Sequence, residues 1–169
     1  EFGQNVGYLP QDTELFSGTI RDNIARFRPD ISDSEVILAA RIAGVHELIL
    51  RLPAGYDTEL GEAAQALSAG QKQRVGFARA IVGDPKFIVL DEPNASLDAE
   101  GEEALLAGLD VMKAHGCTIV VVSHKPGIFR AADKMLVLRD GRMEMFGPRD
   151  AVWARVTQAQ PVRAVEGSR

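Results

Sequence analysis

Several features that define large classes of proteins are missing or scarce in this sequence. A single cysteine, Cys117, has no partner within the chain for a disulfide or a cysteine-ligated metal cluster, which is compatible with the cytosol. The net charge of -5 provides no basic footprint for nucleic acid or anionic lipid, so we expect no nucleic-acid partner. The apolar run at residues 118–122 has only strand length, which excludes it as a bilayer-spanning helix.

The residues that are present suit one globular domain, since the chain has 169 residues and 46% of them are hydrophobic. The first residue is Glu1 rather than Met, and no positively charged stretch followed by an apolar one marks a signal peptide. We therefore expect a chain that is entered midway. Any membrane association is expected to come through a partner or through a segment outside the printed sequence.

The first half of the chain is expected to be rich in helices. Ser32 and Glu35 form a capping box ahead of a helical apolar pattern that runs to Gly44. The expected elements of this half are a strand over 6–9, helices over 19–26, 32–44, 46–52 and 71–82, and an ordered loop over 52–65.

The second half alternates short apolar runs with helical patterns, which predicts a parallel α/β sheet buried on both faces. Asp140-Gly141 is a strong signal for a two-residue hairpin, so this sheet should end in an antiparallel pair. Trp153 is expected to pack against the body of the protein. The expected elements are strands over 87–90, 117–122, 135–138 and 142–146, and helices over 99–114 and 148–156.

The most informative chemical feature is an apolar strand that ends in two adjacent carboxylates, Asp91 and Glu92. Ligands of open α/β sheets bind beyond the carboxyl ends of the strands, so both acids should face a ligand. One carboxylate can hold Mg²⁺, while the next orients or deprotonates a water for attack on a phosphate. Alone, the motif is equally compatible with a strand followed by a solvated acidic turn.

A second feature is the small-residue turn Leu67-Ser68-Ala69-Gly70-Gln71, which leads directly into a helix. Backbone N–H groups at a helix start, a serine hydroxyl and two small residues make a site that an anion can approach closely. In isolation, an ordinary N-cap by Ser68 is the simpler interpretation.

Two further candidates follow apolar strands. His124, after the strand at 117–122, can hydrogen-bond a terminal phosphate or its attacking water, or is a surface loop histidine. Gln11 and Asp12, after the strand at 6–9, either supply an amide oxygen to Mg²⁺ or to a water, or form a polar turn. We interpret Cys117 as a buried core thiol rather than a nucleophile.

In their order along the chain, these features resemble the ATP-binding domain of ABC transporters. Gln11 is similar to the Q-loop, L-S-A-G-Q to the signature motif, F-I-V-L-D-E-P to the Walker B strand, Ser96-Leu97-Asp98 to the D-loop and His124 to the switch histidine. The resemblance implies an incomplete ABC ATPase domain of the P-loop NTPase-like α/β class. It would cover residues 1–156, with a helical signature subdomain over about 12–84, a Walker B and switch part over 85–156, and a frayed tail over 157–169.

The resemblance also implies roles for individual residues. Two ATP molecules would lie between the ATPase domains of a head-to-tail dimer, and Gln11 and Asp91 would serve Mg²⁺. Glu92 would be the general base, and His124 would sense the terminal phosphate. The remaining ATP-binding residues would be Ser68, Ala69, Gly70 and Gln71, which contact the ATP held by the other subunit, and Asp98.

Within the family, the sequence most resembles the ATPases of type I protein secretion. Ala69 in the signature motif and Asn94 after the Walker B proline are similar to that group, and residues 55–62 resemble the exporter loop that contacts the membrane domain. This likeness implies ATP hydrolysis coupled to protein export at the cytoplasmic face of the inner membrane. The partner would be a transmembrane domain of the same parent chain.

One motif of the family is absent, because G-x-x-x-x-G-K-[ST] occurs nowhere in the sequence. In the family, this loop lies upstream of the Q-loop together with a central strand. We therefore expect the printed polypeptide to hydrolyse no ATP by itself, and the apolar flanks of its sheet to be exposed.

Two alternative functions remain open. In the first alternative, the chain would be a module that only completes another chain's ATP site. In the second, it would be part of a soluble ABC ATPase of DNA repair or translation. The acidic net charge and the exporter-like loop at 55–62 argue against the second alternative.

Overall fold

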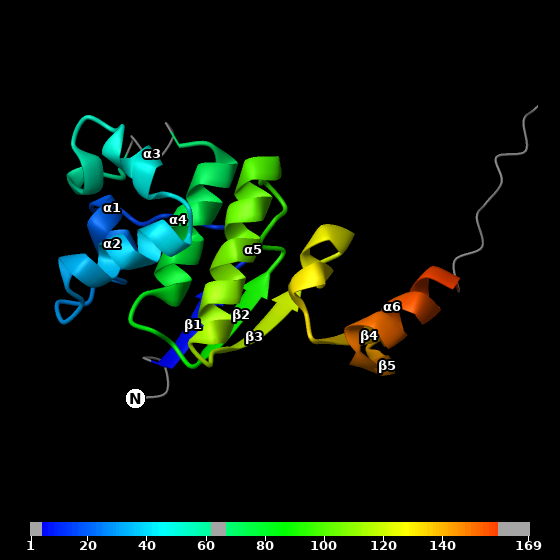
Figure 1. Ribbon diagram of the computed structural model, residues 1–169. Helices are drawn as coiled ribbons and strands as arrows, with labels where there is room; N and C mark the ends of the chain where they lie inside the picture. The colour runs from blue at the N-terminus through cyan, green and yellow to red at the C-terminus, as the bar shows by residue number, and fades with distance from the viewer. Residues whose placement is uncertain (1–4, 62–66, 159–169) are drawn as a thin grey trace, which may run out of the picture. The chain divides into compact units, whose positions relative to one another are not determined.

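The computed structural model describes residues 5–61 and 67–158 (Figure 1). The chain divides into two compact units, Glu1–Ile128 and Phe129–Arg169, which are treated separately below. Within the described ranges, no helix has the length and apolar character needed to cross a membrane.

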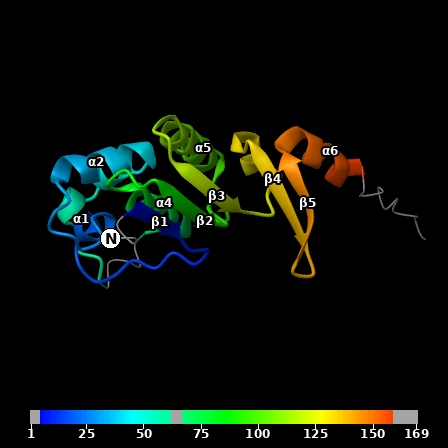
Figure 2. The same cartoon turned by 90° about the horizontal axis from the view of Figure 1, so that it is seen from below.

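A three-stranded parallel sheet forms the centre of the first unit, with the strand order β1-β2-β3. Its strands are β1 (Val6–Leu9), β2 (Phe87–Asp91) and β3 (Thr118–Val122), which lie side by side in Figure 2. Leu9 pairs with Leu90, and Leu90 pairs with Val121. The segments that follow the three strands therefore emerge at the same edge of the sheet.

The helices of this unit begin and end close to the predicted positions. Ser32 and Ser68 each cap the helix that follows them, through a reciprocal capping box with Glu35 and Gln71 respectively. The helices are α1 (Ile20–Ile24), α2 (Asp33–Ile42), α3 (His46–Leu50), α4 (Ala69–Ile81) and α5 (Ala99–Ala114), with the 3-10 turn η2 (Gly55–Asp57). A further 3-10 turn, η4 (Pro126–Ala131), begins in this unit and ends in the second. The loop predicted over 52–65 contains η2, and its residues 62–65 lie outside the described ranges.

One face of the parallel sheet is covered by helices. Leu9, Ile88 and Leu90 are fully buried on this face, where α4 packs against β1 and α5 against β3. Cys117, directly before β3, is also buried, and burial raises the pKa of its thiol, in agreement with a core role.

The opposite face of this sheet is open within the described residues, so the expectation of a sheet buried on both faces is wrong for them. Tyr8, Val120 and Val122 on this face are 55%, 43% and 52% exposed. The strand order explains the difference, because right-handed crossovers between strands added in one direction place all their helices on the same face. The exposure of the valines agrees with the expected exposed apolar flanks.

The second unit consists of a β-hairpin and a helix. Strands β4 (Lys134–Arg139) and β5 (Arg142–Pro148) pair antiparallel, and α6 (Arg149–Gln158) packs on both. Asp140 and Gly141 have φ angles of 50° and 73°, the left-handed values that a two-residue type I′ turn requires, so the predicted hairpin is confirmed.

Trp153 on α6 has its ring centroid 5.9 Å from that of Phe129, so it packs within the second unit. Helix α6 continues two residues beyond its predicted end, to Gln158. The rest of the predicted frayed tail, residues 159–169, lies outside the described ranges.

The predicted antiparallel pair is present as the hairpin of β4 and β5. Over the described residues, these two strands are hydrogen-bonded to each other as a two-stranded sheet, and β3 is hydrogen-bonded only to β2.

Candidate functional site

Glu92 and His124 come together at the carboxyl edge of the parallel sheet. Glu92 follows β2, His124 follows β3 by two residues, and the Glu92 N–H donates to the Val122 carbonyl at 2.8 Å. The adjacent parallel strands thus bring two residues that are 32 positions apart into one site.

The Glu92 carboxylate is held by three groups of the loop after β3. Its Oε1 accepts the His124 backbone N–H at 3.1 Å and lies 2.8 Å from His124 Nδ1, while Ser123 Oγ donates to Oε2 at 3.2 Å. The imidazole ring thus lies directly against the carboxylate. Glu92 therefore does not belong to a solvated acidic turn.

The two side chains differ in their exposure. The side chain of Glu92 is 13% exposed, whereas that of His124 is 77% exposed. The histidine therefore lies on the surface, as its simpler interpretation expected, and still contacts the carboxylate. The carboxylate of Glu92 is therefore held in place, and the imidazole of His124 is accessible to a ligand at the surface.

The backbone of Glu92 is in the left-handed region, with φ at 48°. This conformation costs a residue other than glycine about 1–3 kcal/mol, so the surrounding structure must hold it. The Glu92 carbonyl accepts from Gln73 Nε2 at 2.8 Å and from the Ala95 N–H at 3.1 Å. Gln73 was not among the residues predicted for the site.

A signal for Gln73 was present in the sequence. The residue stands four and eight positions before Phe77 and Ile81, which are buried on α4, so it is a polar residue on the apolar face of a helix. Buried polar side chains are normally hydrogen-bonded and have a specific partner. Among the described residues, the buried polar side chains are Asn23, Gln73 and Asn94.

Asn94 anchors the loop that carries His124. Its Oδ1 lies 3.2 Å from Ser123 Oγ, whose single proton is shared between this oxygen and Glu92 Oε2, and its Nδ2 donates to Glu102 Oε1 at 3.4 Å. Lys125 Nζ donates to the Asn94 carbonyl at 2.7 Å and lies 3.5 Å from Glu102 Oε1. The loops after β2 and β3 and the first turn of α5 are thereby tied together.

Gln11 and Asp91 lie on the same sheet edge. Asp91 is the last residue of β2, and Gln11 follows β1, the strand paired with β2, by two residues. Asp91 alternates with the buried Leu90, so it belongs to the face that the helices leave open. An amide oxygen and a carboxylate are oxygen donors of the kind that Mg²⁺ prefers, so the chemistry of these two side chains fits the ion.

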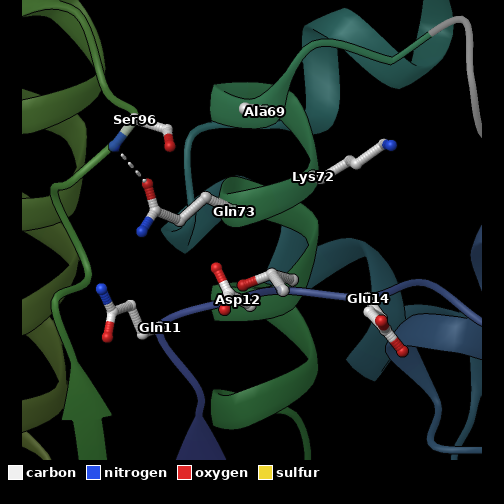
Figure 3. A pocket seen from close by; sticks show the side chains of 8 residues that line it. Gln11, Asp12, Glu14, Ala69, Lys72, Gln73 and Ser96 are labelled. Atoms are coloured by element: carbon white, nitrogen blue, oxygen red, sulfur yellow. Dashed lines mark hydrogen bonds between the residues drawn. The ribbon is translucent and has the colours of Figure 1, made fainter.

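A polar pocket of about 230 Å³ separates the segment after β1 from α4 (Figure 3). In the figure, Gln11 and Asp12 lie along one side of it, and Gln73 reaches across from α4 to Ser96. Its lining residues are Gln11, Asp12, Thr13, Glu14, Ala69, Lys72, Gln73 and Ser96.

The signature-like segment forms the first turn of α4. Ser68 Oγ accepts the Gln71 N–H at 3.2 Å, and Gln71 Oε1 accepts the Ser68 N–H at 2.9 Å, so the interpretation of Ser68 as an N-cap is correct. This box satisfies two backbone donors of the turn and leaves those of Ala69 and Gly70 to other acceptors. The box is compatible with an anion site and does not by itself indicate one.

Gly70 has a packing role that the sequence did not reveal. A Cβ added there would lie 2.8 Å from the Ser96 carbonyl oxygen, closer than real side chains approach. The small residue therefore lets the segment around Ser96 pack directly against the start of α4.

Asp98 caps α5. Its Oδ1 accepts the Gly101 N–H at 2.8 Å and Arg74 Nη2 at 3.1 Å. The pKa of Asp98 lies below its ordinary value, chiefly because the Gly101 N–H donates to the carboxylate, with a smaller contribution from Arg74. Asp98 thus connects α5 to Arg74 on α4.

The predicted site residues accordingly form two groups. Gln11, Asp91, Glu92 and His124 lie at the sheet edge, and the segment at 68–71 and Asp98 lie at the starts of α4 and α5. Gln73 and Ser96 stand between the two groups. Gln11 of the first group and Ala69 of the second line the same pocket.

The chain is similar to known proteins over most of its length. It is 50% identical over 160 residues to the type I secretion system ATP-binding protein PrsD of Rhizobium meliloti, covering 95% of this chain and 28% of that protein. It is 39% identical over 151 residues to the cyclolysin secretion/processing ATP-binding protein CyaB of Bordetella pertussis, covering 89% of this chain and 21% of that protein. The predicted resemblance to type I secretion ATPases is confirmed.

A solved structure of a bacterial Atm1-family ABC exporter with ATP bound matches the fold, with a TM-score of 0.81 and 35% identity. The match covers 95% of this chain and 29% of that one, so the chain spans less than a third of each of these relatives. This likeness confirms the predicted ABC ATPase fold class. Residues 1–95 match the family model described as ABC transporter, and the chain belongs to that family.

Proposed function

We propose that this chain is part of the ATP-hydrolysing domain of an ABC exporter that serves type I protein secretion. The observation that carries the proposal is the contact between the Glu92 carboxylate and His124 at the carboxyl edge of β2 and β3. The likeness to two secretion ATP-binding proteins supports the class of transport.

The residues at the carboxyl edge of the sheet have different roles in the proposed hydrolysis of ATP. Glu92 accepts a proton from the attacking water, and its contacts with Ser123 and His124 keep the carboxylate pointed at one place. His124 is exposed enough to turn its ring toward a terminal phosphate while its backbone N–H still holds Glu92. Gln11 and Asp91 hold Mg²⁺, which neutralises phosphate charge when bound.

The second group of residues serves a partner domain. Ser68, Ala69, Gly70, Gln71 and Asp98 contact ATP held by a second ATPase domain, in a head-to-tail dimer. The N–H groups at the start of α4 suit phosphate oxygens. The dimer acts at the cytoplasmic face of the inner membrane on a transmembrane domain of the parent chain, whose two conformations it favours in turn through its affinity for ATP and for the products.

The Glu92→Gln variant of the parent transporter tests the proposal. We expect steady ATP turnover to fall by about 10²-fold or more, because the amide cannot take the proton, while ATP binding persists. ATPase assays and ATP-binding measurements on membranes or purified transporter give both values. Full turnover by the variant would contradict the proposal and favour a module that only completes another chain's ATP site.

The printed polypeptide by itself is proposed to be inactive. It has no G-x-x-x-x-G-K-[ST] segment to cradle phosphates, and Val120 and Val122 expose an apolar sheet face that needs cover. Titration with Mg-ATP by calorimetry, after circular dichroism has established whether the chain is folded, should detect no binding. Micromolar binding would show that the chain holds nucleotide by another route.

A further inference from the structure

Gln73 connects the two groups of site residues. We propose that Gln73 is a positioning residue that locks the backbone of Glu92 to helix α4, so that a shift of the signature segment at one ATP site changes the catalytic carboxylate at the other. This inference rests on the proposed function. It concerns a residue whose side chain is hydrogen-bonded to the backbone of Glu92 and of Ser96.

The side-chain amide of Gln73 brackets the turn that follows β2. Its Nε2 donates to the Glu92 carbonyl at 2.8 Å, and its Oε1 accepts the Ser96 N–H at 3.1 Å. The residue is 3% exposed, so water does not compete for these groups. One side chain therefore holds both ends of the five-residue segment 92–96.

The amide works in only one orientation. If its oxygen and nitrogen exchanged places, the oxygen would face the Glu92 carbonyl and the NH₂ group would face the Ser96 N–H. Both contacts would then be repulsive and buried. The Gln73 amide consequently specifies the direction of the Glu92 carbonyl, and with it the left-handed backbone at that residue.

Helix α4 contacts the same segment a second time. Gly70, one turn before Gln73, packs so closely on Ser96 that a Cβ would meet the Ser96 carbonyl at 2.8 Å. Gln73 and Ser96 also line the pocket that contains Gln11 (Figure 3). The turn at 92–96 therefore follows α4 when the helix moves, because hydrogen bonds fix both of its ends and Gly70 packs directly on Ser96.

Gln73 lies on α4 close to the segment that is proposed to contact ATP. The residue lies two positions after Gln71, the last residue of the segment proposed to contact the ATP of the other subunit. Glu92 is proposed to act on the ATP of its own subunit. A hydrogen-bonded side chain thus joins the contact for one nucleotide to the base for the other, within one rigid helix.

The experiment compares variants of the parent transporter. Gln73→Leu removes both hydrogen bonds at similar size, whereas Gln73→Glu keeps the acceptor for Ser96 and loses the donor to Glu92 unless its carboxyl is protonated. Asn23→Ala is the matched control, because Asn23 is also a buried amide, with bonds to Phe16 and Thr19 on a different loop. The measured quantities are ATP affinity and the turnover number per ATP-binding site. Because misfolded protein binds no ATP, it does not lower the turnover number.

We expect Gln73→Leu to lower the turnover number at least about tenfold with ATP affinity unchanged, since small misplacements of a catalytic group are costly. Asn23→Ala should lower the yield of folded transporter without changing turnover per site. For Gln73→Glu, the ratio of its turnover to that of wild type should rise as pH falls, because burial raises the pKa of the new carboxyl and protonation restores a donor.

Wild-type turnover per site in Gln73→Leu would overturn the inference, as would a turnover ratio for Gln73→Glu that does not change with pH. An equal loss of turnover in Asn23→Ala would also overturn it, by showing a general effect of losing a buried amide. Failure of the proposed function looks different, since then Glu92→Gln would retain full activity whatever the Gln73 variants do.

Discussion

Strands β2 and β3 are similar in sequence and differ in surroundings. Phe87–Asp91 and Thr118–Val122 are both five-residue apolar strands in parallel register. In β2, Ile88 and Leu90 are fully buried, whereas no residue of β3 is buried. The difference arises because β2 has a strand on each side and β3 has one on a single side within the described residues. Neighbours, rather than composition, decide what an apolar strand buries.

The same difference extends to the residues that follow the strands. Glu92, after the inner strand, is largely buried and held through both its side chain and its backbone. His124, after the outer strand, is exposed and contacts Glu92 through its ring and its backbone N–H. The inner strand thus ends in a fixed carboxylate, and the outer strand is followed by an accessible imidazole.

The largest expected effect comes from comparing the loss of the His124 side chain with the loss of the Glu92 carboxylate. His124→Ala removes the ring contact with Glu92 and keeps the backbone N–H bond, so turnover by the transporter should fall roughly 10–10²-fold, the value of one hydrogen bond to a charged group. This is less than the loss expected for Glu92→Gln. Single-turnover and steady-state ATPase assays measure both. If His124→Ala were the more damaging change, the fixed carboxylate would not be the principal catalytic group.

The second prediction tests burial directly with two matched substitutions. Ile88→Thr leaves a cavity and buries a hydroxyl, and should lower the free energy of unfolding by about 2–4 kcal/mol. Val120→Thr changes an exposed side chain to one of similar shape and should stay within about 0.5 kcal/mol. Urea unfolding measures each. A costly Val120→Thr in the parent transporter would show that another segment covers this face there.

Amide hydrogen exchange should order the strands in the same way. The amides of β2 lie between two hydrogen-bonded neighbours, whereas those of β3 lie beside one, so we expect the amides of β2 to exchange more slowly than those of β3. Exchange followed by mass spectrometry or NMR resolves the two strands. Equal protection would mean that β3 has a neighbour on its outer edge in the protein measured.

The smallest effect concerns Asp98, in the connection between β2 and β3. Its pKa is lowered on folding, so its ionised form stabilises the protein above the unfolded pKa, and this contribution is lost as pH falls through the lower folded pKa. Asp98→Asn keeps a capping oxygen and removes the charge. The unfolding midpoint of the variant should depend less on pH than that of wild type below about pH 4. Identical pH profiles would show that the charge of Asp98 has no role.

Much of the local structure was predictable because it depends on neighbours in sequence. The helix over 99–114 has its predicted bounds, with Asp98 as cap and Gly116 in the left-handed conformation after it. The hairpin at Asp140-Gly141 follows from the φ angles that those two residues tolerate. The strand ends that carry Gln11, Asp91, Glu92 and His124 followed from apolar runs that stop at polar residues.

Long-range packing was not predictable in the same way. Gln73 contacts the Glu92 carbonyl, and Asn94 contacts Ser123, which in turn contacts the Glu92 carboxylate. Nothing in the sequence near these residues shows that they meet. Gly70 was interpreted as space for a ligand, and the structure shows that its missing Cβ makes room for the Ser96 carbonyl.

The residues along the chain suffice to specify the helices, strands, caps and turn, and the family motifs that they carry, since these depend on backbone preference and on spacing over a few positions. The open sheet face, the separate hairpin and the bond between Gln73 and Glu92 depend on contacts between distant segments. Only the folded arrangement sets those contacts, because burial and hydrogen bonding are properties of what surrounds a residue in space.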